Sequence, residues 1–362
     1  MSRKKELGQF YTTRWEYILH GMSIPKNVSR IVEPFVGSGE LLQFIEKDTC
    51  LNNIQIDLYD IDPPTPYISC FHKHCKIHKQ DTLFQPPDYT NSFVLTNPPY
   101  VARNKYSGTK TLFSHYKTND MYKCFIQTLI IGNACGGIII IPLNFWSSIR
   151  ANDISLRKHF LKQYSVQRVN VFEEPVFEDT SYTICSVQFE KSDITGSSTN
   201  TSEIVLPFFI YPSTIEKKIA IYKDSGIIGG ELYTLGTSRI KVKRLTKLTV
   251  SKKNTNLIVH CIDTSQPIHM QWTENVYIDN TPNLSCRSFL TPIIEPAITE
   301  QQQHELVLLF NNFINENRTK YHSLFLTNYR ENGRKRISFD LIYTIISYLI
   351  NERMVVVPPH TK

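Results

Sequence analysis

Two consecutive prolines close a short apolar run in the first third of the chain, and they restrict the local fold more than any other feature. Residues 93–95 form the apolar run, and Thr96-Asn97-Pro98-Pro99-Tyr100 follows at once. Each proline lacks a backbone N–H and biases the residue before it toward extended geometry. The chain can therefore neither continue as a strand nor enter a helix there, and the turn is stiff.

A stiff turn suits a site that grips one planar amine. The side-chain oxygen of Asn97 and the carbonyl of Pro98 can converge on such an amine, with the ring of Tyr100 over its plane. An amine held in this way can be kept pyramidal, with its lone pair free to attack a methyl group. An ordinary X-Pro-Pro turn at the end of a strand is the alternative interpretation.

A glycine-containing turn stands earlier in the chain. Ile31 and Val32 read as a buried strand that turns through Gly37-Ser38-Gly39 into a helix starting near Glu40. Such glycines let the backbone approach a nucleoside-like ligand closely. The third glycine of a dinucleotide-binding pattern is missing, and a carboxylate at Glu33 would repel a pyrophosphate but favour a cation. The turn therefore favours S-adenosylmethionine over NAD, with a generic strand–turn–helix connection as the alternative.

Acidic residues follow the next two expected strands. Asp60 ends one of them, at the distance from the glycine turn where a carboxylate can accept both hydroxyls of a ribose. Asp57 or Asp62 can instead be surface acids, and the sequence does not separate them. The third strand is expected to end near Asp81, which can accept from an adenine amino group while Phe84 lies against the ring.

The N-terminal segment also has the character of a ligand contact. Residues 7–13, Leu-Gly-Gln-Phe-Tyr-Thr-Thr, precede a helix-like stretch at 15–20. A glycine and small hydroxyl residues ahead of a helix let the backbone approach a ligand, and they also cap the helix. Both interpretations stay open on these residues alone.

The middle of the chain predicts the rest of an α/β sheet, because helical apolar spacing alternates with apolar runs. The expected elements are helices at 121–133 and 153–163, a central parallel strand at 136–142, and an antiparallel strand pair at 168–172 and 182–189. Phe177 stands in an acidic loop between the paired strands. We expect its ring to be exposed and to offer a surface for stacking.

Basic residues gather in two parts of the chain. Arg103 and Lys105 lie in the polar loop after Tyr100, where cations beside an amine-gripping turn are well placed for phosphates. Beyond a Ser/Thr-rich stretch at 191–203, which reads as a linker, the composition becomes basic. The cations there include Arg239, Lys241, Lys243, Arg244, Lys247, Lys252, Lys253, Arg334, Lys335 and Arg336. Each group can be a solvated face, but two of them favour a nucleic-acid-reading module.

Composition sets broader bounds. The 362 residues carry a net charge of +7 and a pI near 8.8, which permits a polyanionic partner. The chain has no signal-like start and no apolar run of membrane-spanning length, so we expect neither export nor a membrane segment. Eight cysteines without a framework pattern fit reduced thiols inside a cell. The cysteines and histidines at 70–78 lack the paired spacing of a zinc site, and no metal is expected.

The order of these motifs resembles that of the gamma-group DNA N6-adenine methyltransferases. Gly-Gln-Phe-Tyr-Thr comes first at 8–12, the glycine turn second, Asn97-Pro98-Pro99-Tyr100 third and the basic segment last, and the match spans residues 7–189. The resemblance implies an α/β fold: a Rossmann-like S-adenosylmethionine-binding catalytic domain at 1–203 and a DNA target recognition domain at 204–362. It further implies a type II restriction–modification methyltransferase of bacterial or viral origin.

The same resemblance implies roles for individual residues. Cofactor contacts would come from Tyr11 and Thr12 at the carboxylate, Glu33, Gly37 and Gly39 along the methionine moiety, Asp60 at the ribose, Asp81 and Phe84 at the adenine, and Asn97. The target amine would be bound by Asn97 and Pro98, and the target base would lie between Tyr100 and Phe177. Contacts to DNA would come from Arg103, Lys105, Lys243, Arg244, Arg334, Lys335 and Arg336.

The implied reaction is methylation of the N6 amine of an adenine that has been flipped out of duplex DNA. We expect duplex DNA and a cognate restriction endonuclease as partners, and a cytoplasmic monomer or homodimer. Asn in the first position of the tetrapeptide favours adenine over cytosine-N4, whose enzymes more often resemble Ser-Pro-Pro-Tyr. Ribosomal-RNA or protein-glutamine methyltransferases meet the same geometric problem and stay open, as does a catalytically silent nucleic-acid-binding protein.

Overall fold

The computed structural model describes residues 12–47, 54–63, 75–178, 180–192, 202–236, 239–280, 287–327 and 333–354. These residues form two compact units, of which the first runs to Gly226 and the second begins at Ile227. Each unit has a core of its own.

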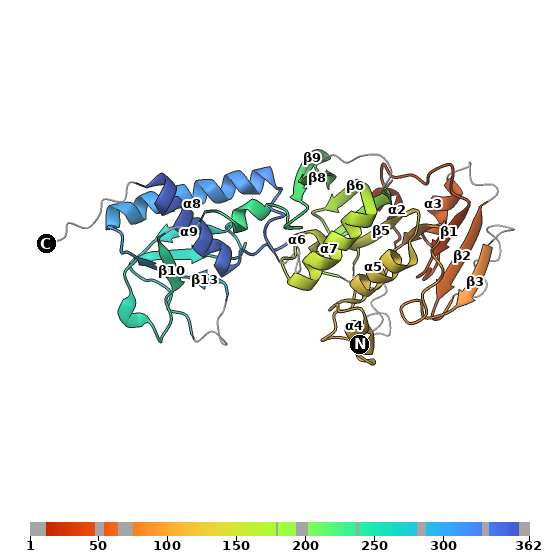
Figure 1. Cartoon of the computed structure of the whole chain (residues 1–362), viewed down its shortest axis with the longest axis horizontal. Coiled ribbons are helices and arrows are strands. Elements are labelled where there is room, and N and C mark those ends of the chain that lie inside the picture. Colours follow the sequence, from red (N-terminus) through yellow and green to blue (C-terminus); the bar gives the residue numbers. More distant parts are fainter. Residues whose placement is uncertain are drawn as a thin grey trace. The chain divides into compact units, whose positions relative to one another are not determined.

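The first unit is built on a nine-stranded sheet, counted over the described residues, in the order β3-β2-β1-β4-β5-β7-β6-β8-β9 (Figure 1). Strands β1 to β5 are parallel, β7 is antiparallel to both of its neighbours, β8 is parallel to β6, and β9 is antiparallel to β8. The strand bounds are β1 (Arg30–Glu33), β2 (Gln55–Asp60), β3 (Cys75–Lys79), β4 (Phe93–Thr96), β5 (Gly136–Pro142), β6 (Tyr164–Phe172), β7 (Ile184–Lys191), β8 (Glu203–Tyr211) and β9 (Ile215–Tyr222).

This strand order creates a crevice at the carboxyl ends of β1 and β4. The chain begins the sheet at β1, moves outward to β2 and β3, and then returns to start β4 on the other side of β1. A doubly wound sheet binds its ligand where the strand order reverses in this way. The sheet is a Rossmann-like α/β sheet, with the reversed β7 between β5 and β6, so the predicted α/β, Rossmann-like fold is confirmed.

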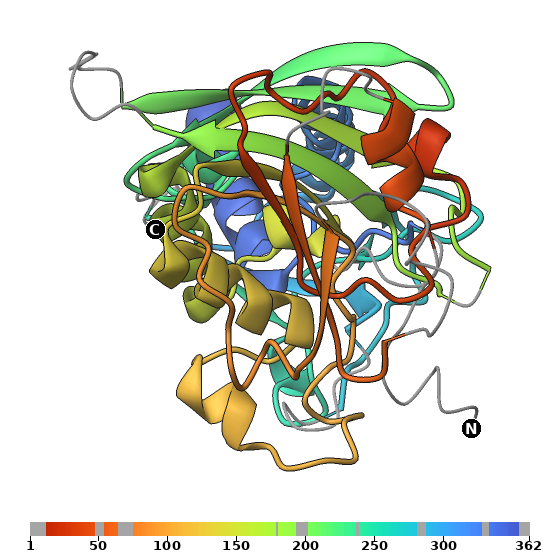
Figure 2. The same ribbon diagram turned by 90° about the vertical axis from the view of Figure 1, so that its right-hand side faces the viewer.

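Helices cover both faces of this sheet. In Figure 2, α2 and α3 lie on one face, and α5 and α7 lie on the other. The bounds are α2 (Trp15–Ile18), α3 (Leu42–Lys47), α4 (Thr111–His115), α5 (Met121–Gly132), α6 (Asn144–Ser147) and α7 (Ala151–Gln163). The helices predicted at 121–133 and 153–163 are confirmed to within one helical turn, and so is the antiparallel pair formed by β6 and β7.

Strand β5 lies at the centre of the core. All seven of its residues are buried, as predicted for a strand that is apolar on both faces. Gly137 is needed there because the neighbouring strands approach closely. A Cβ atom at Gly137 would stand 2.4 Å from the carbonyl oxygen of Val94 on β4 and 2.9 Å from the ring of Phe189 on β7.

The predicted domain boundary after residue 203 differs from the division between the two compact units. Strands β8 and β9 lie beyond that boundary, yet they extend the sheet of the first unit through the pairing of β8 with β6. The alternation of apolar and polar residues that would reveal β8 is missing from the sequence, because the apolar Val205 stands at a position that is 55% exposed and Pro207 lies within the strand. Of the Ser/Thr-rich stretch that prompted the boundary, 193–201 lies outside the described residues.

The second unit combines small sheets with two long helices. Strand β10 pairs antiparallel with β14, and β11 lies between β12 and β13. The bounds are β10 (Lys241–Arg244), β11 (Leu257–His260), β12 (His269–Trp272), β13 (Phe289–Leu290), β14 (Pro292–Glu295), α8 (Glu300–Lys320) and α9 (Phe339–Arg353). Helix α8 begins with a capping box between Thr299 and Gln302. Among the described residues, no helix has both the length and the apolar character needed to cross a bilayer.

We expect Gly137→Ala to destabilise the first unit. The added methyl group would overlap a carbonyl oxygen that the sheet holds in place, and overpacking a core costs about 1–3 kcal/mol. Denaturant unfolding followed by circular dichroism should show a lower midpoint than that of the wild type. Gly236→Ala is the control, because a Cβ atom at Gly236 meets nothing within 4 Å. Equal midpoints for Gly137→Ala and wild type would contradict the close strand approach.

Candidate active site

A pocket opens where the strand order reverses, at the carboxyl ends of β1 to β4. It holds about 870 Å³ together with the solvent at its mouth, which suits a small-molecule ligand. Its walls come from segments that are far apart in the sequence. The residues singled out by the sequence that line it are Thr12, Gly37, Asp60, Asp81 and Asn97. The structure therefore brings five of the predicted contacts to one pocket, whereas Glu33, Gly39 and Phe84 are not among its lining residues.

The carboxylate of Asp60 fastens the glycine turn. Its Oδ2 atom accepts the N–H of Gly37 at 3.0 Å, and its Oδ1 atom accepts the N–H of Asp62 at 2.9 Å. The φ angles of Gly37 and Gly39 are 54° and 87°, a region that glycine enters without the strain of a side chain. The turn and the end of β2 are thus joined at the pocket wall.

The structure also separates the three aspartates that the sequence left open. Asp57 is buried and its Oδ2 atom pairs with the guanidinium of Arg30 at 2.7 Å. Asp62 is exposed. Asp60 is the member of this group that lines the pocket.

Glu33 links the end of β1 to the end of β4. Its side chain is buried, and its Oε1 atom accepts the hydroxyl of Thr96 and the N–H of Phe35, the latter at 3.1 Å. Burial raises the pKa of Glu33 to about 8, although both hydrogen bonds act in the opposite direction. Within the described part of the chain, its Oε2 atom has no hydrogen-bond partner. A buried carboxyl oxygen of this kind suits a cationic ligand atom.

The amide of Asn97 is held from two sides. Its Nδ2 atom donates to the hydroxyl of Thr12 at 3.1 Å, and its Oδ1 atom accepts from the hydroxyl of Tyr100. The same Tyr100 hydroxyl lies 2.7 Å from the carbonyl oxygen of Ile140. One hydroxyl proton serves one acceptor at a time, so Tyr100 can donate to Ile140 when another donor takes the Asn97 oxygen. Asn97 can therefore receive an amine without leaving the Tyr100 hydroxyl unsatisfied.

The ring of Tyr100 is less accessible than a stacking platform needs to be. It is 4% exposed and packs edge-on against Tyr122 and Tyr182, with ring centroids 6.2 and 6.3 Å away. Burial raises the pKa of Tyr100 well above its ordinary value, which keeps the hydroxyl a proton donor. A base can stack on this ring once one of the neighbouring rings moves.

The expected exposure of Phe177 is wrong. Phe177 and Val176 are each 6% exposed, while Glu178 beside them faces solvent. The acidic residues of this loop predicted an exposed ring, but Val176 and Phe177 are buried while Glu173 and Glu178 are exposed. The assignment of Phe177 to the target base stays a prediction, and it now starts from a buried ring.

The neighbourhood of the pocket carries an exposed ring and exposed cations. The carboxylate of Asp81 accepts the N–H of Phe84 at 3.4 Å, and the Phe84 ring is 51% exposed. Arg103 and Lys105 are exposed in the loop that leads to Tyr106, which lines the pocket. These positions fit the predicted contacts to an adenine ring and to phosphates.

Two predictions from the sequence fall partly outside the described residues. Tyr11 belongs to residues 1–11, and 70–74 belong to the Cys- and His-rich segment; neither range is described. Within the described ranges, no three His, Cys, Asp or Glu side chains come together as a metal site would require.

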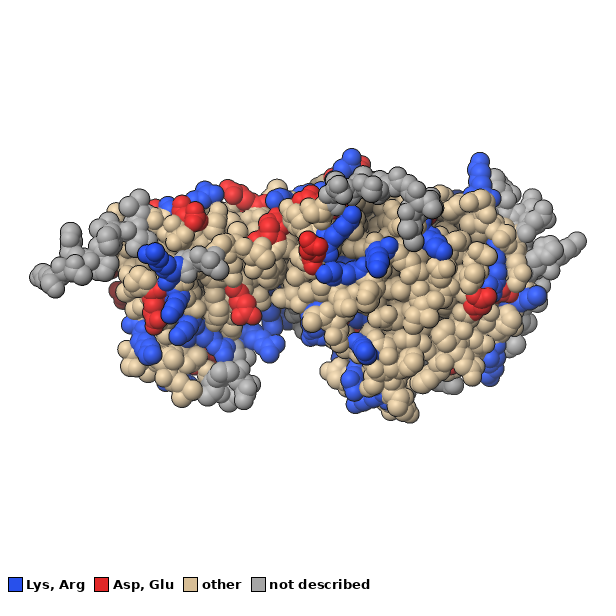
Figure 3. Space-filling model, viewed as in Figure 1, with Lys and Arg blue, Asp and Glu red and all other residues tan. Residues whose placement is uncertain are grey.

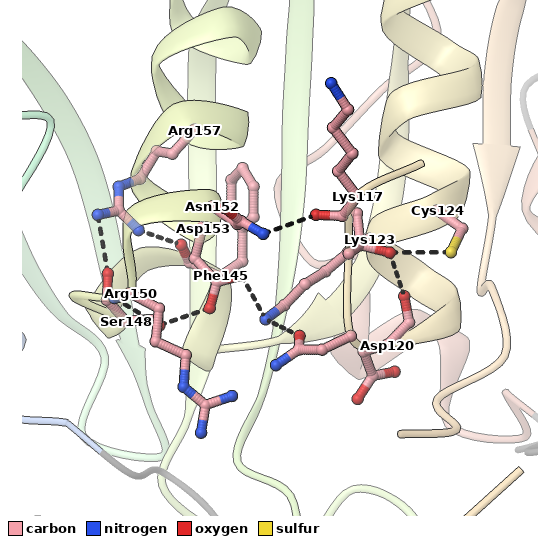
Figure 4. Close-up of polar contacts among 12 residues, drawn as sticks. Lys117, Asp120, Lys123, Cys124, Phe145, Ser148, Arg150, Asn152, Asp153 and Arg157 are labelled. Carbon is pink, nitrogen blue, oxygen red and sulfur yellow. Dashed lines mark hydrogen bonds and ion pairs between the residues drawn. The ribbon is translucent and has the colours of Figure 1, made fainter. Parts of the chain in front are cut away.

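A buried charge network, which sequence reasoning missed, borders the loop that follows Tyr100 (Figure 4). The amine of Lys123 on α5 is buried and lies 2.7 Å from Oδ1 of Asp153 and 2.9 Å from Oδ1 of Asn119. Asp153 also accepts the hydroxyl of Ser148 at 2.6 Å. Burial lowers the pKa of Lys123, and the charge of Asp153 opposes this. The network ties the loop after Tyr100 to α5 and to the start of α7.

Arg157 fastens the segment after β5 to α7. Its guanidinium is fully buried and donates to the carbonyls of Phe145 at 2.6 Å and Ser148 at 3.0 Å (Figure 4). It also donates to the carbonyl of Gly226 at 2.7 Å. Burial lowers the pKa of Arg157 to about 10. The available sequence signal was the spacing of Asp153 and Arg157, four residues apart on one helix face.

The predicted DNA contacts of the second unit divide into two kinds. Lys243 is exposed on β10, as a phosphate contact requires. The contact of Arg244 with DNA stays a prediction, and its guanidinium already pairs at 3.0 Å with the buried carboxylate of Asp279 and lies over the ring of Phe339. Its charge therefore holds this unit together. Arg334, Lys335 and Arg336 are half-buried.

No protein-family model and no curated protein matches the sequence. Among solved structures, a protein described as a modification subunit of a type I restriction enzyme from Vibrio vulnificus YJ016 is 18% identical, with a TM-score of 0.43 over 58% of this chain and 49% of that one. A type I restriction–modification methyltransferase subunit from Streptococcus thermophilus is 16% identical, with a TM-score of 0.40 over 60% and 51%. The match thus spans about half of either protein, and we draw no functional argument from it.

Fold and pocket together define a class. The chain contains a Rossmann-like α/β domain with a pocket at the reversal between β1 and β4 that suits a small-molecule ligand.

The buried network yields a stability prediction. Lys123→Met leaves the Asp153 carboxylate buried without its cation, which costs about 3–5 kcal/mol. The double variant Lys123→Met/Asp153→Leu removes both charges and should recover much of that loss. Denaturant titration of wild type, both single variants and the double variant completes the cycle.

An exposed ion pair supplies the control for this cycle. Glu16 and Lys47 lie 2.9 Å apart with both side chains 67% exposed. Glu16→Gln should change the free energy of unfolding by less than about 1 kcal/mol. An equally small effect of Lys123→Met would show that the buried pair does not hold the loop.

Proposed function

We propose that the chain is an S-adenosylmethionine-dependent methyltransferase that modifies an exocyclic amine of a nucleic-acid base. The observation that carries the proposal is the position of Asn97-Pro98-Pro99-Tyr100 at the end of β4, beside the glycine turn at the end of β1, with Asn97 and Gly37 lining one pocket. A methyl donor held by the glycine turn and an amine held by Asn97 and Pro98 would meet there.

The polar groups of the pocket fit this cofactor, which carries an α-ammonium and a sulfonium. Glu40, Asp60 and Asp81 are among the lining residues described, and that set contains no Lys or Arg. An acidic lining favours a cationic ligand over the pyrophosphate of a dinucleotide. The Asp60 carboxylate keeps lone pairs for ribose hydroxyls in addition to its two N–H contacts. Glu33, which directly precedes the lining residues Pro34 and Phe35, would turn its buried Oε2 atom, for which the described residues provide no hydrogen-bond partner, to the ammonium.

The bound cofactor supplies an electrophilic methyl group on a positively charged sulfur. That methyl group would pass to the target nitrogen as its bond to sulfur breaks, and the methylated amine would give up one proton to water. The chain contributes position, since the Asn97 oxygen and the Pro98 carbonyl accept the two N–H groups and leave the nitrogen lone pair free. Fixed proximity and orientation account for much of the acceleration in reactions of this kind.

We extend the proposal to the N6 amine of adenine in duplex DNA. The first residue of the Asn-Pro-Pro-Tyr segment is Asn rather than Ser, which favours adenine over cytosine. Arg103 and Lys105 are exposed and can contact phosphates. A paired adenine must be flipped out of the stack to reach the pocket. Such an enzyme would protect host DNA beside a restriction endonuclease that reads the same site.

A cytosine-N4, ribosomal-RNA or protein-glutamine methyltransferase would use the same amine geometry. Incubation with isotopically labelled cofactor and DNA, RNA or protein, followed by mass spectrometry of the digests, identifies the methylated group. We expect N6-methyladenine from duplex DNA. Labelled N4-methylcytosine would instead identify a cytosine-N4 enzyme, labelled RNA a ribosomal-RNA enzyme, and labelled methylglutamine a protein-glutamine enzyme.

Asn97→Ala should abolish methyl transfer and spare cofactor binding. The Asn97 amide contacts Thr12 and Tyr100, whereas the glycine turn is held by Asp60. Calorimetric titration with the cofactor should therefore give nearly the wild-type Kd. Asn152→Ala is the matched control, since that amide donates to the carbonyl of Lys117 outside the pocket, and it should keep full activity. Loss of cofactor binding by a folded Asn97→Ala variant would contradict this division of roles.

Glu33 should release a proton when the cofactor binds. The pKa of Glu33 is raised from 4.5 to about 8, so the free protein holds this proton between those values. The contribution of Glu33 to the free energy of unfolding therefore falls as the pH rises from 4.5 to about 8, because the unfolded chain gives up this proton more readily. An ammonium placed beside Glu33 lowers its pKa and expels the proton.

Calorimetry at pH 7 in two buffers of different ionisation enthalpy measures the proton release. Wild type should release close to one proton more than Glu33→Gln, which retains the acceptor for Thr96 and Phe35. Equal release by the two proteins would mean that Glu33 stays a neutral tie between β1 and β4 and does not contact the ammonium.

A further inference from the structure

Two branched apolar side chains stand in water on one short loop of the second unit. Leu248 is 76% exposed and Val250 is 48% exposed. The loop, residues 246–253, follows β10 and contains the short helix η3 (Val250–Lys252). We name it the 246–253 loop. Single exposed apolar residues are common, so the surrounding structure must decide whether these two have a role.

The first end of the 246–253 loop is firmly held. The hydroxyl oxygen of Thr249 accepts the N–H of Thr246 at 2.9 Å, and the N–H of Thr249 donates to the carbonyl of Thr246 at 2.9 Å. The N–H of Lys247 donates to the carbonyl of Asp279 at 2.9 Å. The carboxylate of Asp279 is in turn paired with Arg244 at 3.0 Å. A buried ion pair thus anchors the base of the loop.

The second end is fastened to β14. The side chain of Asn254 donates to the carbonyl of Ile294 at 2.6 Å and accepts its N–H at 3.1 Å. The hydroxyl of Thr255 donates to the carbonyl of Pro292. With both ends tied, the loop presents Leu248 in a set position. A partner that takes this side chain has little ordering entropy to overcome.

The surroundings of the two apolar side chains are basic. Lys247, Lys252 and Lys253 are exposed in the loop, and Lys243 is exposed on β10. Figure 3 shows several Lys and Arg side chains over the part of this unit where Figure 1 labels β10. The carboxylate at the base of the loop, that of Asp279, is buried. Exposed lysines therefore flank the apolar projection on its own loop and on β10, and some acidic side chains lie in the same region (Figure 3).

We propose that Leu248, supported by Val250, is a wedge that enters between stacked bases of duplex DNA while the neighbouring lysines hold the phosphates. The lysines select a polyanion, and the apolar projection selects one whose base steps can be opened, as apolar wedges do in other DNA-bending proteins. The inference rests on the proposed function in placing duplex DNA on this chain. It uses no residue of the pocket.

The test uses full-length protein and a duplex that carries a fluorescent adenine analogue, which brightens when it unstacks. Wild type should bind and brighten the duplex. Leu248→Ala should weaken binding about tenfold, as expected when one leucine loses its buried contact, and should lose the brightening. Leu308→Ala is the matched control: Leu308 is 67% exposed on α8 of the same unit and should behave as wild type.

Salt titration separates the lysines from the wedge. Lys247→Gln should reduce the slope of log Kd against log salt concentration by about 1, while Leu248→Ala should leave the slope unchanged. Wild-type affinity and brightening in Leu248→Ala would overturn the proposal. So would Leu248-dependent binding to heparin, a polyanion without bases, or to vesicles of anionic lipid.

Failure of the wedge and failure of the proposed function give different results. Methylation of DNA by a Leu248→Ala variant with unimpaired duplex binding would overturn the wedge alone. Leu248-dependent unstacking by a protein that binds no S-adenosylmethionine would overturn the methyltransferase proposal and support the wedge.

Discussion

The hydrogen bond from the Thr96 hydroxyl to the buried carboxyl of Glu33 sets the geometry on which the pocket depends. It joins the end of β1, where the glycine turn begins, to the end of β4, where the two prolines begin. The backbone pairing of the two strands runs through Ile31 and Val32 and includes neither Glu33 nor Thr96. A side-chain contact is therefore what keeps the two turns at a fixed distance. Because the carboxyl is buried, the contact is shielded from competing water.

The remaining walls of the pocket are joined in the same manner, through polar contacts between segments that are distant in the sequence. Asp60 holds Gly37, and Asn97 reaches Thr12. Each of these contacts ends on an oxygen atom that can take a second partner, since carboxylate and hydroxyl oxygens have two lone pairs. The Tyr100 hydroxyl has a second acceptor in the Ile140 carbonyl. The pocket can therefore exchange internal hydrogen bonds for ligand hydrogen bonds without leaving a buried group unsatisfied.

The sequence predicted those parts of the structure that follow from local chemistry. Prolines stop a strand, and a run such as residues 136–142 fills the centre of a sheet, whatever the rest of the chain does. The sequence did not predict the environments of Arg244 and Phe177, because residues distant in sequence form them. The basic strand around Arg244 predicts a solvated charge, but Asp279, which is distant in the sequence, pairs with it. The acids around Phe177 predict an exposed ring, but the loop folds so that the ring is buried. The first unit extends past residue 203 for the same reason, since β8 finds its partner in β6.

The charges of the chain are divided between two kinds of location, and this division bears on how two ligands of opposite sign can be bound. The pocket is lined by acids, while the net charge of +7 arises from cations such as Arg103, Lys105 and Lys243 that face solvent. Exposed charges are screened by salt over about 10 Å at ordinary ionic strength, whereas buried groups such as Glu33 are screened much less. A cationic cofactor and a polyanionic substrate would therefore meet separate fields, and salt would loosen the second while leaving the first in place.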